Sequence, residues 1–176
     1  MHALVLVLQL HNLAGAPPRT VAAAALEVSR LYAQIGVTIA WEEQDAAIGG
    51  DVDVVRVVVL PLETGDLRRA PDTVMGAAVA AGARTRVAYV YYHRVRSEAE
   101  RNGASTQQVL ACAIAHELGH LLLPGEAHSA TGLMRASWQR DDFGRANQGQ
   151  LRFSAEQAAR IRLQPSVEHE GGDRAR

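Results

Sequence analysis

Several features are scarce in this chain of 176 residues, and each scarcity excludes a class of protein. A single cysteine, Cys112, excludes an internal disulfide. No run approaches the roughly 20 apolar residues that a membrane-spanning helix needs, so we expect no membrane partner. The formal net charge is only −1, which gives no reason to expect nucleic acid or an anionic membrane surface as a partner.

Length and apolar content bound the architecture. With 48% apolar residues, the chain is expected to form one domain with a sizeable core, and to be a monomer. Its apolar start, residues 3–10, lacks the basic region and the small-residue cleavage site of a signal peptide. That start therefore predicts a buried strand, covered on both faces because its residues alternate little.

The spacing of apolar residues predicts an alternation of strands and helices. Five segments are predicted as strands: 3–10, 37–41, 54–60, 74–80 and 87–92. Three are predicted as helices: 19–35, 105–123 and 154–163. The first helix is long enough to join parallel neighbouring strands, and residues 125–150 show no periodicity and are expected to be irregular.

Local signals mark the ends of these helices. Gly36 is expected to end the first helix, since glycine readily adopts the left-handed conformation found there. Ser105 to Gln108 and Ser154 to Gln157 each have the spacing of a capping box, which predicts a helix start. Pro124 and Gly125 should end the second helix near residue 123.

One motif on the second helix carries chemistry. His116 and His120 are separated by one helical turn, so both imidazoles can reach one metal ion. Glu117 lies about 100° round the helix, beside that metal without binding it. This HExxH pattern predicts a Zn²⁺ ion as cofactor and Glu117 as the general base of a peptide-bond hydrolase.

Hydrolytic zinc usually takes three protein ligands, and several residues compete for the third position. His128 is favoured, because Pro124 and Gly125 end the helix and let the chain turn back towards the metal. Glu156 is the candidate if the third ligand is a carboxylate. The weaker carboxylate candidates are Asp141 and Asp142, and Glu126 is interpreted as a solvated loop charge.

Cys112 lies one helical turn before His116. We interpret it as a small buried residue of the helix, with a thiolate ligand or redox switch as the alternative.

The run HELGHLLLPGEAHSATGLM resembles the metzincin clan of zinc peptidases, whose pattern is HExxHxxGxxH followed by a methionine turn. The resemblance runs through these positions: His116, Glu117, His120, Gly125, His128 and Met134. The glycine and the third histidine fall two residues late, as if Leu123 and Pro124 were inserted, but their mutual spacing is kept. His128 followed by Ser129 is similar to the matrix-metalloprotease-like branch.

The resemblance implies an α+β fold over nearly the whole chain. The expected core is a twisted, mixed five-stranded sheet, mostly parallel with one antiparallel edge strand, packed on the N-terminal and active-site helices, with a C-terminal helix. A single catalytic domain would span residues 1–164, with an N-terminal lobe at 1–123 and a C-terminal lobe at 124–164. Residues 165–176 would form a frayed tail.

The resemblance also implies roles for particular segments. Edge strand 74–80 would pair with an extended peptide or protein substrate. Met134 would lie beneath the zinc, and residues 135–140 would form a pocket wall shaped by Arg135 and Trp138. No tyrosine stands two positions after Met134, so an additional tyrosine ligand is not expected. The family resemblance alone suggests a secreted or periplasmic location.

Three hypotheses follow for the function. The leading one is a metzincin-type zinc peptidase, most simply an endopeptidase, with a three-histidine site. A gluzincin-like peptidase with Glu156 as third ligand is the second. A non-catalytic, zinc-stabilised binding module is the third, and Glu117 argues against it, because a purely structural zinc site has no use for a base.

Overall fold

The computed structural model describes residues 4–42, 54–63, 71, 73–81, 85–123, 125 and 127–164. Strands and helices follow one another in this order: β1 (Leu4–Asn12), α1 (Pro18–Ala33), β2 (Val37–Glu42), β3 (Val54–Leu60), β4 (Gly76–Ala81), β5 (Thr85–Tyr91), α2 (Tyr92–Arg101), α3 (Thr106–Leu122), α4 (Arg140–Asn147) and α5 (Ala155–Arg162). The predicted strands and the three predicted helices are all present, with ends shifted by at most two residues.

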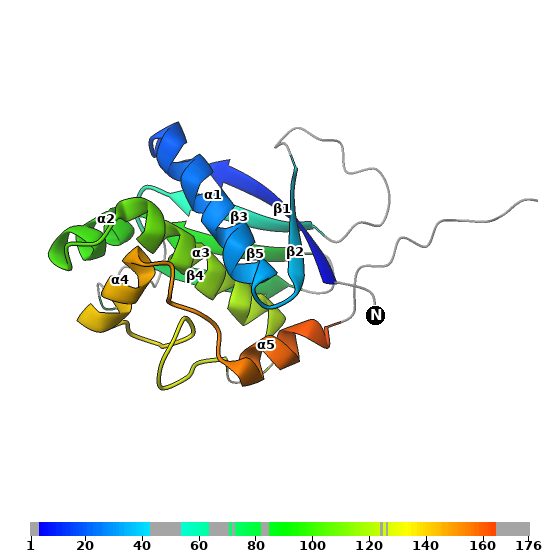
Figure 1. Ribbon diagram of the computed structural model, residues 1–176. Helices are drawn as coiled ribbons and strands as arrows, with labels where there is room; N and C mark the ends of the chain where they lie inside the picture. Colours follow the sequence, from blue (N-terminus) through cyan, green and yellow to red (C-terminus); the bar gives the residue numbers. More distant parts are fainter. Residues whose placement is uncertain are drawn as a thin grey trace, which may run out of the picture.

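The five strands form one sheet in the order β2-β1-β3-β5-β4 (Figure 1). β1 pairs in parallel with β2 and β3, and β3 pairs in parallel with β5. β4 runs antiparallel to β5 and has no further strand beside it within the described part of the chain. The α+β fold with a mixed sheet and one antiparallel edge strand is therefore confirmed.

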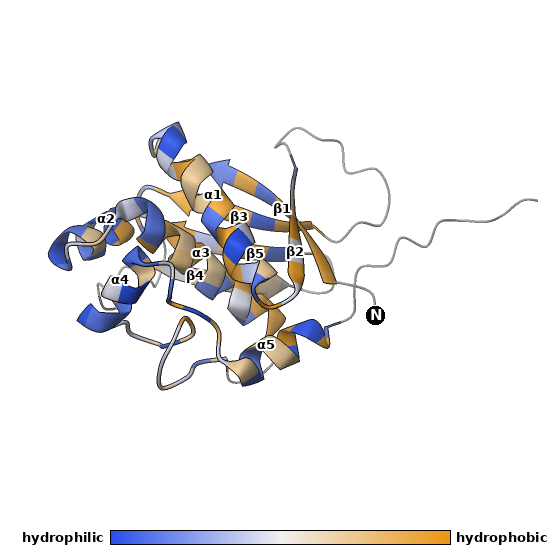
Figure 2. Ribbon diagram, viewed as in Figure 1, coloured by the Kyte–Doolittle hydropathy of each residue, from blue (hydrophilic) through white to orange (hydrophobic). Residues whose placement is uncertain are grey.

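Helices α1 and α3 lie on the same face of the sheet and pack against each other (Figure 1). Their contact includes a long-range hydrogen bond, in which the hydroxyl of Tyr32 donates to the carbonyl of Ala115 at 3.1 Å. Figure 2 shows that apolar residues concentrate on the strands and α3, whereas α2 and α4 are largely hydrophilic. Burial of this shared apolar layer holds α3, and with it the HExxH motif, against the sheet.

The prediction that β1 is covered on both faces is wrong. Leu6 and Leu8 are buried beneath the helices, whereas Val5, on the opposite face, is 42% exposed. Because α1 and α3 occupy the same face, side chains from Leu4 to Leu8 alternate between the core and a more open surface.

Two helices were not predicted from the sequence. Residues 125–150 were expected to be irregular, but α4 forms at 140–147. It is capped by Gln139 and Asp142 in a reciprocal capping box, and glutamine is not among the residues that usually begin one. α2 follows directly from β5 without a side-chain cap, so no sequence signal separates the two elements.

The two predicted capping boxes have different outcomes. Ser154 and Gln157 form the expected box at the start of α5, with bonds of 3.1 and 2.9 Å. Ser105 does occupy the N-cap of α3, but its side chain makes no capping bond. Instead its backbone N–H donates to Oδ1 of Asn147 at 2.7 Å, so the last residue of α4 meets the start of α3.

No helix in the described ranges combines the length and the apolar character that crossing a bilayer requires. The predicted tail at 165–176 lies outside the described residues. The division into lobes at residue 123 stays a prediction.

Candidate metal centre

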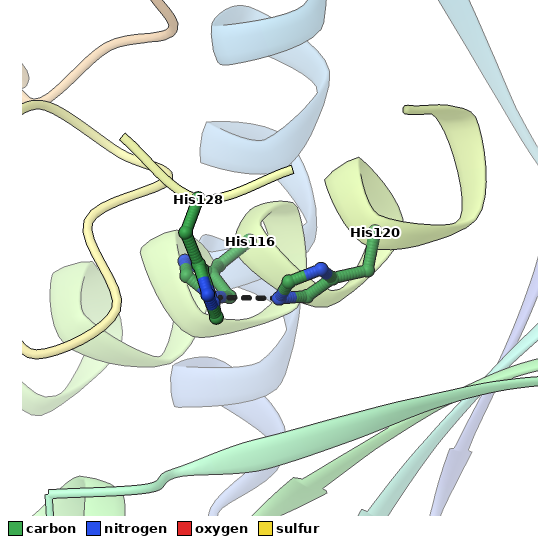
Figure 3. A group of neighbouring side chains, drawn as sticks. All are labelled: His116, His120 and His128. Carbon is green, nitrogen blue, oxygen red and sulfur yellow. Dashed lines mark hydrogen bonds between the residues drawn. The ribbon is translucent and has the colours of Figure 1, made fainter. Parts of the chain in front are cut away.

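Helix α3 presents His116 and His120 on one face, as the spacing of one helical turn requires. Their Nε2 atoms face each other at 3.0 Å (Figure 3). Two Zn–N bonds of ordinary length at a tetrahedral angle would place the nitrogens about 3.3 Å apart. The two imidazoles are therefore already close to the separation that one zinc ion imposes.

His128 reaches the same point from the loop after α3. Its ring centroid lies 4.7 Å from that of His120 and 5.6 Å from that of His116. One nitrogen from each histidine can be chosen so that all three lie within 4.8 Å of one another. In Figure 3 the three side chains converge from α3 and the loop, which makes them a group that could hold a metal ion.

His116 is oriented by the chain that follows His128. Its Nδ1 donates to the carbonyl of Leu133 at 2.8 Å, which leaves Nε2 free to face the other histidines. Nε1 of Trp138 donates to the same carbonyl at 3.1 Å, and its ring meets the imidazole edge to face at 6.0 Å. Leu133 and Trp138 thus hold one ring orientation.

Burial keeps two of these histidines in the form that binds metal. It lowers the pKa of His116 to about 4, mainly through desolvation, against the opposing effect of the Leu133 carbonyl. Burial also lowers the pKa of His120, with a further contribution from His128. Both imidazoles are neutral at neutral pH, and neutral nitrogen donors in a three-histidine set suit zinc.

The loop that carries His128 is tied to the C-terminal helix by Gln157. The Nε2 amide of this buried side chain donates to the carbonyl of Ala127 at 3.2 Å and to Oγ of Ser129 at 3.1 Å. Gln157 therefore caps α5 and fixes both neighbours of His128. The sequence indicated the cap, but no signal in it points to the bonds with residues 127 and 129.

Met134 lies against α3 at Gly119, the residue before His120. A Cβ atom added at Gly119 would lie 2.5 Å from Sδ of Met134 and 3.1 Å from Cε1 of Phe153. Met134 is fully buried, and its carbonyl accepts from the N–H of Ser129 at 2.9 Å. Met134 is thus packed between the helix and the loop of His128.

Glu117 is buried beside the edge strand. Only 6% of its surface is exposed, and desolvation raises its pKa to about 8. At Gly76 of β4, an added Cβ atom would lie 2.7 Å from Oε1 of Glu117 and 2.6 Å from the carbonyl oxygen of Tyr89. The absence of a side chain at Gly76 therefore lets the backbone of β4 approach the carboxylate.

A cavity of about 380 Å³ connects these groups. One wall is the segment from Thr73 to Ala80, which includes β4, and another is formed by Arg135, Ala136 and Trp138. All three histidines and Glu117 also line it. The two residues expected to shape a pocket wall, Arg135 and Trp138, do border this cavity.

The other candidate ligands do not join the group. Glu156 is exposed in the first turn of α5, and the metal-binding group found among the described residues does not include it. Asp141 is exposed, and Asp142 accepts hydrogen bonds from Arg135 and from the N–H of Gln139. Glu126 lies outside the described residues.

Cys112 lies in the core rather than at the metal centre. It is 2% exposed, and burial raises the pKa of its thiol to about 12. The interpretation as a small buried residue therefore fits, since a neutral buried thiol is inert.

Comparison with known proteins adds no relative, because no family model and no curated protein matches this chain. The metal centre therefore rests on the geometry of His116, His120 and His128.

Proposed function

We propose that this chain is a zinc-dependent peptidase that cleaves extended peptides. The observation that carries the proposal is the shared cavity, where the three histidines, the buried Glu117 carboxylate and the edge strand β4 meet. A purely structural metal site needs neither a carboxylate that is not a ligand nor an open cavity beside it. Zinc is proposed rather than another metal because a three-histidine set with an open position is typical of hydrolytic zinc.

A zinc ion held by the three histidines would supply a Lewis acid that acidifies water and polarises a peptide carbonyl. Glu117, whose raised pKa a nearby cation would lower, would accept the proton from the attacking water at its carboxylate and then deliver it to the leaving amine. Its burial beside Gly76 places that carboxylate in a low-dielectric environment, where little bulk water competes for the proton.

The backbone of β4 would bind the substrate. β4 pairs with β5 on one side, and its other side has no partner strand among the described residues. An extended peptide can add to such an edge through backbone N–H and carbonyl groups. The side chains of Ala77 and Ala78 are small, so they permit close approach of a second backbone.

Metal analysis tests the ligand set. We expect about one zinc per chain in the parent protein and in Glu117→Gln, and little in His128→Ala. His93→Ala is the matched control, because His93 is exposed on α2 and belongs to no metal-binding group found among the described residues. Full zinc content in His128→Ala would exclude His128 as a ligand and reopen the carboxylate alternatives.

Hydrolysis of fluorescein-labelled casein tests the base. Glu117→Gln keeps the shape of the side chain but removes proton transfer, so we expect roughly a hundredfold loss of rate or more with zinc still bound. Equal rates for the parent and this variant would contradict the mechanism. A zinc-loaded parent that hydrolyses no peptide would instead favour the non-catalytic binding module.

A further inference from the structure

Arg135 gives the cavity a localised positive charge. Among the described residues that line this cavity, it is the one with a permanent positive charge. Another wall is formed mostly by small and apolar residues of the β4 segment, and Glu117 is the one carboxylate among the described lining residues. A charged group on a ligand would therefore meet Arg135 in largely apolar surroundings.

The guanidinium of Arg135 retains donors for a ligand. Nη1 donates to Oδ2 of Asp142 at 3.3 Å, and within the described part of the chain no second protein acceptor contacts the group. Asp142 is itself held by the backbone N–H of Gln139 at 2.9 Å. A guanidinium has five N–H donors, so most of them remain available, and 26% of the side chain is exposed.

The backbone of Arg135 is fixed beside the third histidine. Its N–H donates to the carbonyl of Gly132 at 3.1 Å, and it forms an isolated bridge with Ser129, the residue after His128. These backbone contacts fix the position from which the Arg135 side chain extends, next to the loop that carries His128. Arg135 and all three histidines line the same cavity of about 380 Å³.

We propose that Arg135 selects substrates with a carboxylate one or two residues from the cleaved bond. A guanidinium binds a carboxylate through two parallel charge-assisted hydrogen bonds, which neutral side chains cannot replace. The carboxylate belongs either to an Asp or Glu side chain or to the C-terminus of a short peptide. This inference rests on the proposed peptidase function, whose substrate class it names.

The first test is cleavage of a mixed peptide library by zinc-loaded protein, with product sequences read by mass spectrometry. For the parent we expect Asp, Glu or a free C-terminus to be enriched within two positions of the cleaved bond. Arg135→Gln should lose that enrichment. The matched control is Arg145→Gln, which removes the same charge from an exposed position on α4 that does not line the cavity.

The second test separates the two sources of the carboxylate. Fluorogenic peptides with Glu or Gln beside the cleaved bond, each ending in a free acid or an amide, are compared by kcat/KM. We expect about a tenfold preference for one carboxylate source in the parent, and none in Arg135→Gln. Arg135→Lys keeps the charge but not the forked geometry, so its preference should be intermediate.

A binding measurement keeps this inference distinct from the proposed function. Fluorescence anisotropy of the same labelled peptides on zinc-loaded Glu117→Gln, with and without Arg135→Gln, reports recognition in the absence of turnover. If the parent and Arg135→Gln both cleave neutral and acidic peptides at equal rates, the inference about Arg135 is overturned. The proposed peptidase function is unaffected by that result. If the parent cleaves no peptide, the proposed peptidase function is wrong. In that case, peptide binding that is lost in Arg135→Gln would still support the carboxylate site, and binding that is unchanged would exclude it.

Discussion

At the scale of single residues, the site requires glycine at two positions, Gly76 and Gly119, because a side chain at either would collide with a neighbour. Gly76 leaves room for the Glu117 carboxylate against β4, and Gly119 leaves room for the Met134 thioether against α3. Both contacts would be shorter than 3.0 Å with a Cβ atom present, so a methyl group cannot be added without displacing a neighbour. These glycines are explained by close packing and not by backbone conformation, because neither has a positive φ.

Substituting alanine for two helical glycines should have opposite effects on stability. Gly119→Ala places a methyl group 2.5 Å from Sδ of the buried Met134, and we expect it to destabilise the fold by about 1–3 kcal/mol. Gly144→Ala in α4 meets nothing within 4 Å and should stabilise by about 0.5–1 kcal/mol, because alanine favours helix. Urea unfolding of both variants checks the pair. Equal effects would contradict the packing of Met134 on Gly119.

Ionisation of Glu117 should make the stability of the metal-free protein depend on pH. Burial raises the pKa of this group from its ordinary value of 4.5 to about 8, so the folded state binds the proton more tightly than the unfolded chain does. Its contribution is fully present below pH 4.5 and is lost as the pH rises to about 8. At pH 7 the loss is about 3 kcal/mol.

Glu117→Gln cannot ionise, so it removes this dependence. The free energy of unfolding of Glu117→Gln relative to the parent should therefore increase by about 3 kcal/mol between pH 5 and pH 8. Urea titrations in the presence of a chelator measure the difference, and titration of the histidines is common to both proteins. Parallel pH profiles would show that the carboxyl group is solvated in solution.

At the scale of elements, α5 is linked to the metal centre through its first turn. Gln157 completes the capping box with Ser154 and also bonds residues 127 and 129, on either side of His128. A helix that begins far along the chain therefore sets the position of the third candidate ligand. Residues that orient a ligand in this way commonly change metal affinity when they are replaced.

Replacing Gln157 should weaken zinc binding more than replacing its capping partner. Gln157→Leu removes both bonds to the loop, and we expect the dissociation constant for zinc to rise roughly tenfold. Ser154→Ala removes a capping bond, costing about 1 kcal/mol of stability, but keeps the loop contacts and should leave zinc affinity unchanged. Competition with a chelating dye measures both. The same affinity in the two variants would argue against a positioning role for Gln157.

At the scale of the whole molecule, the candidate metal centre depends on α3, on the loop that follows it and on α5, which begins further along the chain. α3 contributes two histidines, the following loop contributes the third, and α5 holds that loop. α3 packs on the sheet, and α1 packs beside it on the same face (Figure 1). A metal ion bound by these histidines would cross-link the helix to the loop, so it should stabilise the folded state as a whole.

Removing zinc should lower the melting temperature of the protein. At a free zinc concentration a thousandfold above the dissociation constant, the stabilisation is about 4 kcal/mol, which corresponds to roughly 10 °C for a domain of this size. Differential scanning calorimetry with zinc and with a chelator measures the shift. His93→Ala should keep the shift, and a melting temperature independent of zinc in the parent would contradict a resident metal.

The order of the five strands and of three helices was determined by the sequence alone, because their apolar periodicity and helix-ending residues act over a few neighbouring positions. The same holds for the adjacency of His116 and His120, and for the Ser154 cap. α2 and α4 were missed because neither begins with a Ser or Thr cap, and because their buried positions include the charged residues Arg94, Glu98 and Asp142. The exposure of Val5 could not be foreseen, since it depends on which face the helices cover.

Only the tertiary structure decided how the site is assembled. The approach of His128 to α3, the Leu133 carbonyl that orients His116, and the bonds from Gln157 all join residues far apart in sequence. The contact of Glu117 with Gly76 also joins distant residues, and the cavity that Arg135 lines is formed by several elements. A sequence specifies which groups are present, but their distances and burial follow from packing among elements, and these set both ligand geometry and pKa.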